Sequence, residues 1–309
     1  MDRLPLARLP TPLEIAERLS EAWGARIRVK RDDLTGFGLS GNKVRKLEHH
    51  LAAAVEHGAT TVITCGAVQS NHCRATALAC ARLGLACILV LRTPDGRPPA
   101  EVRGNHLLQR LAGAEVRFVD PEGYERRDEL MATIAADLGD AWVIPEGASD
   151  VVGMQGFVTA AAELADALDG RRATIWHAAS SGGTTAGLAV GAARVGLDVD
   201  LVACSVGDPA AVLDRRISDL VEASGAEAIP WRVVDAYVGG GYGVADVDQL
   251  AVTAEATRLT GLLFDPTYTG KAIYGLHEEL RGGRLPPGAD VVFWHTGGGF
   301  AVFAWDWGT

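Results

Sequence analysis

The sequence predicts an α/β protein built from two open, twisted and mostly parallel sheets covered by helices, with a smaller domain inserted in a larger one. Helical and strand periods alternate along the chain from about residue 44. The predicted strands are apolar on both faces, which is typical of parallel sheets buried between helices. With 309 residues, of which 48% are hydrophobic, the chain is long enough to bury the cores of two domains.

The first α/β unit opens on a helix. Apolar residues recur at helical spacing from Val44 to Val55, and Gly58 ends this helix before the apolar strand "TTVITCG". The unit then repeats, each time with a glycine between helix and strand. The repeated pairs are the helix 72–83 with the strand 86–92, the helix 101–112 with the strand 115–120, and the helix 127–138 with the strand 141–147. Residues 49–152 are therefore predicted to form the small domain.

A long amphipathic helix over residues 153–168 restarts the pattern. Four apolar strands are predicted after it, at residues 173–178, 198–206, 231–238 and 290–298. A further strand over residues 26–33 precedes the first unit and need not pair with the strand that follows it in the chain. We expect residues 1–48 and 153–309 to form the large domain.

Charge and composition exclude several classes of partner. The formal net charge is -10 and the basic residues are scattered, which argues against nucleic acid or an anionic membrane as the main partner. The sequence shows neither an uninterrupted apolar run of about 18 residues nor a secretory signal, so we expect a cytoplasmic protein. Five cysteines without a CxxC pair predict neither disulfides nor a zinc site, and we interpret them as core residues.

Lysine is rare in this chain. Of 29 lysines and arginines, only Lys30, Lys43, Lys46 and Lys271 are lysine, and two of these fall within "SGNKVRKLE". Arginine cannot form a Schiff base, so a lysine in an arginine-rich chain can indicate a reactive amine. The spacing alone nevertheless favours ordinary solvated residues in the first turn of a helix, and other segments must decide.

Polar residues and glycines gather where the predicted strands end, which is where ligands bind in open α/β sheets. After the strand "TTVITCG" come Gln69, Ser70, Asn71 and His72, more polar residues than a helix cap needs. After the strand 173–178 come Ser181, Gly182, Gly183 and Thr184, whose backbone N–H groups can bind a phosphate at a helix start. Neither a Walker loop nor a GxGxxG fingerprint occurs.

Three further segments carry hydroxyl groups beside glycines. "GGGYGV" contains Tyr242, "DPTYTGKA" contains Tyr268 and Thr269, and "FWHTGGGF" contains Thr296. A reactive amine, a nest for a single phosphate and hydroxyl groups near a ring, without metal ligands, together predict pyridoxal 5'-phosphate as the cofactor and no metal.

The sequence resembles the D-cysteine desulfhydrase and 1-aminocyclopropane-1-carboxylate (ACC) deaminase family, which has the tryptophan synthase β-like fold. The resemblance rests on collinear segments along nearly the whole chain. They include "RLPTPLE", "VKRDDLTGFGLSGNKVRKLE", "GAVQSNHCRATA", "VIPEGAS", "SSGGTTAG", "GGYGV", "DPTYTGKA" and "HTGG". The resemblance implies a homodimer that acts on a small amino-acid substrate.

The resemblance also implies roles for individual residues. Lys43 would form the Schiff base with the cofactor, and Lys46 would be a supporting charge. Asn71 would bond the phenolic oxygen of the cofactor and contact the substrate, while Ser70 and the amide of His72 would hold the substrate carboxylate. Ser70 would also be a candidate catalytic acid or base. The remaining implied residues are Ser181, Gly182, Gly183 and Thr184 around the phosphate, Tyr242 and Tyr268 as catalytic and substrate-binding tyrosines, and Thr269 and Thr296 near the pyridine ring.

Two of these residues favour one reaction within the family. ACC deaminases are expected to carry Glu where this chain has Thr269, and an apolar residue where it has Thr296. A neutral hydroxyl leaves the ring a weaker electron sink, which suits α,β-elimination from a substrate such as D-cysteine. The open alternatives are ACC deamination, an L-cysteate sulfo-lyase reaction, β-replacement, racemisation, and a non-enzymatic relative. Ser180, Gly299 and Phe300 depart from the family pattern, and we expect the cofactor site to tolerate these departures and the substrate end to differ from that of the family.

Overall fold

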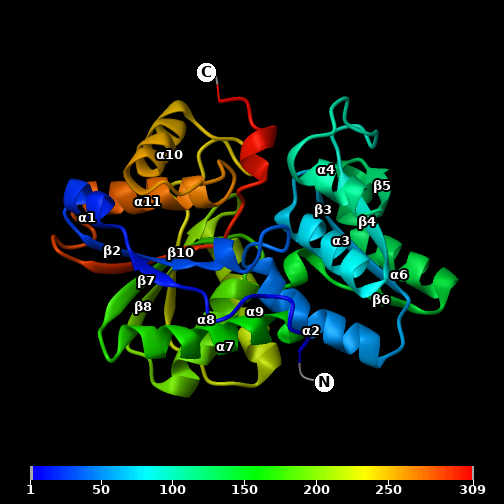
Figure 1. Cartoon of the computed structure of the whole chain (residues 1–309), viewed down its shortest axis with the longest axis horizontal. Helices are drawn as coiled ribbons and strands as arrows, with labels where there is room; N and C mark the ends of the chain where they lie inside the picture. The colour runs from blue at the N-terminus through cyan, green and yellow to red at the C-terminus, as the bar shows by residue number, and fades with distance from the viewer. Residues whose placement is uncertain (1–2, 308–309) are drawn as a thin grey trace.

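A computed structural model describes residues 3–307, which form two sheets side by side (Figure 1). The large sheet has six strands, all parallel except the first pair. In spatial order they are β1 (Leu13–Ile15), β2 (Arg26–Arg31), β10 (Asp290–His295), β7 (Ala173–Ala179), β8 (Val199–Ser205) and β9 (Trp231–Val234). The N-terminal strand β2 thus pairs with β10, the last strand of the chain, and not with β3, which follows it.

Helices cover both faces of the large sheet because alternate strand residues point to opposite sides. In β10, Val291 and Phe293 pack with one group of helices, and Val292 and Trp294 pack with the other. The first group is α1 (Glu17–Trp23), α10 (Val247–Thr260) and α11 (Thr269–Arg281). The second group is α7 (Val151–Leu168), α8 (Gly183–Val195) and α9 (Ala210–Ser224).

The small sheet has four parallel strands. In spatial order they are β5 (Glu115–Val119), β4 (Ala86–Arg92), β3 (Thr61–Ala67) and β6 (Ala141–Val143). Its helices are α2 (Lys43–Glu56), α3 (Asn71–Leu83), α4 (Gly104–Leu111), α5 (Pro121–Glu125) and α6 (Arg127–Leu138). Elsewhere along the chain there are short 3-10 turns, η1 (Asp32–Leu34), η2 (Glu146–Ala148) and η3 (Ala301–Ala304). α2 and α3 pack on one face of this sheet, and α5 and α6 pack on the other. The five cysteines are buried and free.

The predicted fold class is confirmed, and the predicted segments correspond to elements of the structure. Some strands end earlier than predicted: β9 stops at Val234 and β10 at His295, before the turns that carry the site residues. The predicted domain boundary at residues 48 and 49 falls inside α2, which contacts both α7 and the small sheet (Figure 1). The domain boundaries therefore stay a prediction.

The segment Glu146–Leu168 has the length and the mean hydropathy, 1.2, of a membrane span, but half of it is buried inside the protein. Most of this segment is α7, which packs against α2 and α8 as a core helix. Cytoplasmic location stays a prediction.

Candidate active site

A cavity of about 410 Å³ lies between the two sheets. Loops at the carboxyl ends of β3, β7 and β10 line it, together with residues 145–149 and the tyrosines 242 and 268. The sequence-predicted residues that line it are Lys43, Ser70, Asn71, His72, Ser181, Gly182, Thr184, Tyr242, Tyr268 and Thr296. Strand order therefore brings together residues that are separated by more than 250 positions in the chain.

Lys43 is the first residue of α2 and reaches this cavity. Its Nζ donates to the backbone oxygen of Gly147 at 3.3 Å. Burial lowers the pKa of Lys43 to about 8, and the charge of Glu146 opposes part of this shift. Gly147 has a φ of +68°, and a Cβ there would lie 3.0 Å from Nζ and 2.7 Å from the Ser181 hydroxyl, so only glycine leaves the amine its space. The result is an amine that is readily deprotonated and has room to react.

The loop between β7 and α8 has the features of a phosphate site. The Ser181 hydroxyl lies 2.6 Å from that of Ser149, and Lys46 donates to Ser149 Oγ at 2.9 Å. A Cβ at Gly183 would lie 2.7 Å from Lys46 Nζ, so this ammonium sits directly beside the first turn of α8. Asn42, which precedes Lys43, donates to the Thr184 hydroxyl at 3.1 Å. Hydroxyls, free helical N–H groups and a buried cation thus meet at one point, which suits a dianionic phosphate.

Lys46 is not the solvated residue that its spacing favoured. It is fully buried, and burial together with the charge of Lys43 holds its pKa well below the ordinary value. Among residues 3–307 no carboxylate lies within ion-pair distance of either lysine nitrogen. An anion bound beside α8 would supply the missing negative charge.

The start of α3 forms another wall of the cavity. Ser70 caps the helix, since its hydroxyl accepts a hydrogen bond from the N–H of Cys73 at 3.2 Å. Asn71 and His72 are the first two helical residues, whose N–H groups have no carbonyl partner within the helix. The imidazole of His72 is buried, and its Nε2 donates to the Thr64 hydroxyl at 2.7 Å, because that hydroxyl donates to Ile144 O at 2.8 Å. His72 therefore offers the cavity its backbone rather than a charged ring.

Tyr242 and Tyr268 face each other at the cavity. Their hydroxyl oxygens are 2.6 Å apart, and the rings meet edge to face. Burial raises the pKa of Tyr242 to about 12. Burial, with a smaller contribution from the neighbouring Tyr242, raises the pKa of Tyr268 well above its ordinary value. Both phenols are thus neutral near pH 7, so the pair can pass a proton along one short hydrogen bond.

The two predicted threonines have different surroundings. Thr296 lines the cavity, whereas Thr269 does not. The Thr269 hydroxyl donates to Asp265 Oδ1 and accepts from the Asp265 N–H, both at 2.9 Å, inside the turn that starts α11. Thr269 therefore holds the Tyr268 turn onto a buried carboxylate, and Thr296 is the residue of this pair that lines the cavity.

Several residues of the site had no role assigned from the sequence. Glu146, Gly147 and Ser149 lie in "VIPEGAS", a segment that carried the family resemblance without a stated function. Asn105 donates to Asn71 Oδ1 at 2.9 Å and so orients that amide from a helix 34 residues away. Motif order could have drawn attention to all of them, because Asn105 lies in "GNHLLQRLAGAEV", a segment that also appears in family order, but only the tertiary contact shows what Asn105 does.

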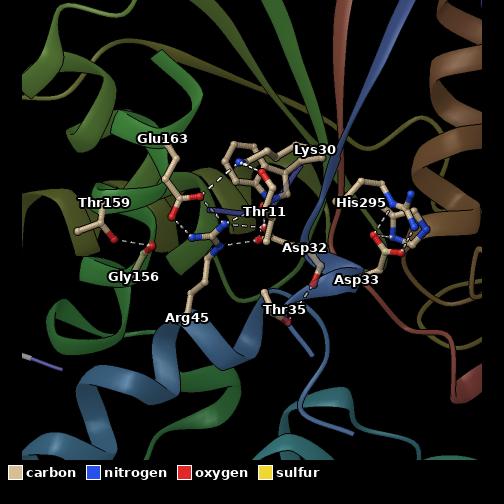
Figure 2. Close-up of polar contacts among 12 residues, drawn as sticks. Thr11, Lys30, Asp32, Asp33, Thr35, Arg45, Gly156, Thr159, Glu163 and His295 are labelled. Carbon is tan, nitrogen blue, oxygen red and sulfur yellow. Dashed lines mark hydrogen bonds and ion pairs between the residues drawn. The ribbon is translucent and has the colours of Figure 1, made fainter. Parts of the chain in front are cut away.

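The opposite side of α2 is fixed by a buried charge cluster (Figure 2). We call Lys30, Asp32, Arg45 and Glu163 the anchor cluster. The Arg45 guanidinium donates to both oxygens of Asp32 at 2.9 Å and to Glu163 at 2.8 and 2.9 Å. Lys30 adds a contact to Glu163 at 3.3 Å, and the Trp294 indole donates to Asp32 at 2.8 Å. Two cations and two carboxylates thus hold the helix that carries Lys43.

The comparisons with known proteins identify the class. The chain belongs to the pyridoxal-phosphate dependent enzyme family, whose model matches residues 4–297. The cofactor of the protein is accordingly pyridoxal phosphate, and the cavity has features that suit it: the amine of Lys43 and, at the start of α8, hydroxyl and N–H groups beside Lys46.

Within this class, the chain is similar to ACC deaminases and D-cysteine desulfhydrases. It is 40% identical over 313 residues to a Thermotoga maritima protein provisionally named an ACC deaminase, with 98% of each chain covered. It is 38% identical to the D-cysteine desulfhydrase of Klebsiella pneumoniae, covering 98% of this chain and 96% of that one. A solved ACC deaminase homologue has a TM-score of 0.90 at 35% identity, with 98% and 94% covered. The protein is thus a member of this lyase and deaminase group.

Proposed function

We propose that the protein is a carbon–sulfur lyase that eliminates the β-substituent of an amino acid such as D-cysteine. With one water, D-cysteine would give pyruvate, ammonia and sulfide. The observation that carries this proposal is the neutral wall of the cavity formed by Thr296 and by the phenols of Tyr242 and Tyr268. The lyase relatives at 38% identity include enzymes named for this reaction.

Each residue would have a defined task. The bound cofactor supplies an electron-withdrawing ring next to the substrate nitrogen. The N–H groups of Asn71 and His72, with the Ser70 hydroxyl, hold the substrate carboxylate. Lys43, with its pKa of about 8, accepts the α-proton. The tyrosine pair then donates a proton to the departing sulfur, across the 2.6 Å hydrogen bond that joins the two phenols.

A neutral group near the ring nitrogen supports elimination over ring opening. Thr296 offers a hydroxyl there, while the nearby Asp265 carboxylate is occupied by the N–H groups of Thr267 and Tyr268 and by Thr269. A cofactor ring whose nitrogen has a neutral partner withdraws less electron density than a pyridinium ring held beside a carboxylate. Departure of a good leaving group such as sulfide requires less electron withdrawal. ACC deamination remains a second candidate, because the Thermotoga maritima relative carries that name. Homodimeric assembly and a cytoplasmic location belong to the same proposal.

A product screen tests the proposal. Purified holoenzyme is incubated with D-cysteine, L-cysteine, L-cysteate, β-chloro-D-alanine and ACC, and keto acid, sulfide and amino-acid products are measured. We expect equal amounts of pyruvate and sulfide from D-cysteine, and no product from Lys43→Ala, which should lose at least about 10³-fold in kcat. The matched control Lys30→Ala removes another buried lysine but keeps the amine at position 43.

The outcomes separate the candidates. 2-Oxobutanoate from ACC, without sulfide from D-cysteine, would replace elimination by deamination. An amino-acid product formed only with an added nucleophile would indicate β-replacement. Borohydride reduction and peptide mass mapping should place the pyridoxyl group on Lys43, and an adduct elsewhere would contradict the site itself.

A further inference from the structure

Lys271 is a fully buried lysine near the tyrosine pair, three residues after Tyr268 on α11. Its Nζ donates to three backbone oxygens, those of Val206 at 3.2 Å, Val238 at 2.7 Å and Gly241 at 2.5 Å. Among residues 3–307 no carboxylate lies within ion-pair distance of this nitrogen. The charge is therefore held by carbonyl dipoles alone, whereas a buried lysine is usually paired with a carboxylate.

The geometry requires the charged form of the side chain. An ammonium group has three N–H donors, and three carbonyls receive them, whereas a neutral amine would leave one carbonyl without a donor. Burial lowers the pKa of Lys271, and the charge of Asp246 opposes that shift. Converging backbone carbonyls are also the ligands that proteins offer to a bare monovalent cation such as K⁺. The three oxygens thus form a cation site that is filled by a side chain.

The three carbonyls come from the two loops that place Tyr242. Val206 follows β8, while Val238 and Gly241 belong to the glycine-rich loop after β9 that continues directly into Tyr242. The two loops touch, because a Cβ at Gly207 would lie 2.9 Å from the Cβ of Tyr242. The lysine itself comes from the helix that Tyr268 caps. One ammonium therefore joins the loop of one phenol to the helix of the other.

We propose that Lys271 is a positioning residue that acts as a tethered monovalent cation, holding Tyr242 in hydrogen-bond contact with Tyr268. The inference rests on the proposed role of the tyrosine pair in the reaction. Arginine would not serve, because its planar fork cannot direct donors to three oxygens arranged around a point. A tethered cation makes the wild-type enzyme independent of added K⁺ or NH₄⁺.

Two variants test this directly. Lys271→Ala opens the site to a free ion, and Lys271→Met fills the same space without charge. Activity and melting temperature of the holoenzyme are measured in KCl, NH₄Cl and tetramethylammonium chloride at equal ionic strength. In tetramethylammonium chloride we expect kcat to fall about tenfold or more in both variants, with KM changed less. K⁺ or NH₄⁺ should restore Lys271→Ala at least about fivefold and raise its melting temperature, in a saturable way. The wild type and Lys271→Met should show neither effect.

Lys30→Ala is the matched control. Lys30 is also buried, but it donates to Thr11 O at 2.6 Å and pairs with Glu163, away from the tyrosines. Its removal should lower the melting temperature without a cation-specific recovery. Wild-type kcat in Lys271→Met would overturn the proposal, even if Lys271→Ala does not fold. A folded Lys271→Ala that no monovalent cation restores or stabilises would also overturn it.

The test is independent of the exact substrate. If D-cysteine is not converted by the wild type, the elimination proposal fails, and kcat is read with whichever amino acid the wild type converts to a keto acid. The melting temperature of Lys271→Ala reports on ion binding without any substrate.

Discussion

Helix α2 carries three cationic side chains in its first turn, and they meet two different surroundings. Arg45 points away from the cavity into the anchor cluster, where it contacts both oxygens of Asp32 and of Glu163 (Figure 2). Lys43 lines the cavity and Lys46 contacts residues that line it, and both find neutral acceptors, the Gly147 carbonyl and the Ser149 hydroxyl. The positive charge on one side of the helix is thus paired with carboxylates of the fold, whereas the amines on the other side contact only neutral groups.

This difference separates anchoring from chemistry. In the anchor cluster, Arg45 holds the pKa of Glu163 below its ordinary value although burial opposes the shift, so this ion pair stays charged and fixed. Burial lowers the pKa of Lys30 in the same cluster, and the charge of Glu163 opposes that shift. On the cavity side no carboxylate of residues 3–307 contacts either amine, and burial lowers the pKa of both lysines, although the charges of Glu146 and Asp150 oppose part of the shift. Those amines can therefore react, or bind an anion that the fold does not provide. The anchor cluster resists movement of the helix when the cavity side changes its charge.

The largest expected effect comes from breaking the anchor cluster. Arg45→Met should destabilise the protein by about 3–5 kcal/mol, because Asp32 would remain buried without its partner. The free energy of unfolding is measured by urea denaturation of the apoprotein. Adding Asp32→Asn to Arg45→Met should recover part of the loss, since it removes the uncompensated charge. A loss below about 1 kcal/mol would show that the cluster does not anchor the helix.

The next effect is a pH dependence that belongs to the cavity side. The pKa of Lys43 is about 8 in the folded protein and 10.5 ordinarily, so between these pH values the unfolded chain binds more protons. The free energy of unfolding should therefore rise as the pH is raised from about 8 to 10.5. The same gain should be lost as the pH is lowered from 10.5 to 8. The gain is about 3–4 kcal/mol relative to Lys43→Met, which lacks the titrating group. Urea denaturation of both apoproteins across this range gives the difference directly, and parallel curves would contradict the lowered pKa.

The two sides of α2 also differ in how well the sequence predicts them. Alternating periods predicted the two sheets and their helices, because buried parallel strands and amphipathic helices leave strong local patterns. The rarity of lysine and the segment around Lys43 pointed to the cavity side. The anchor cluster was not predicted, because Glu163 lies 118 residues from Arg45 and no local pattern joins them. The burial of Lys46 and the position of Thr269 within the Asp265 turn likewise depend on tertiary packing.

The smallest expected effect tests the cavity side at Lys46. Lys46→Met removes a buried charge that no carboxylate balances, so the free energy of unfolding of the apoprotein should stay within about 1 kcal/mol of wild type or rise. Cofactor affinity should nevertheless fall about 10–100-fold, because a phosphate bound at the start of α8, the position we propose for it, would lose its nearest cation. Absorbance titration of the apoprotein with pyridoxal phosphate measures that affinity. The opposite result is a large loss of stability, as in Arg45→Met, together with unchanged cofactor affinity. It would mean that Lys46 belongs to the anchoring side, because removal of a charge destabilises the fold without affecting cofactor binding only where the fold itself neutralises that charge.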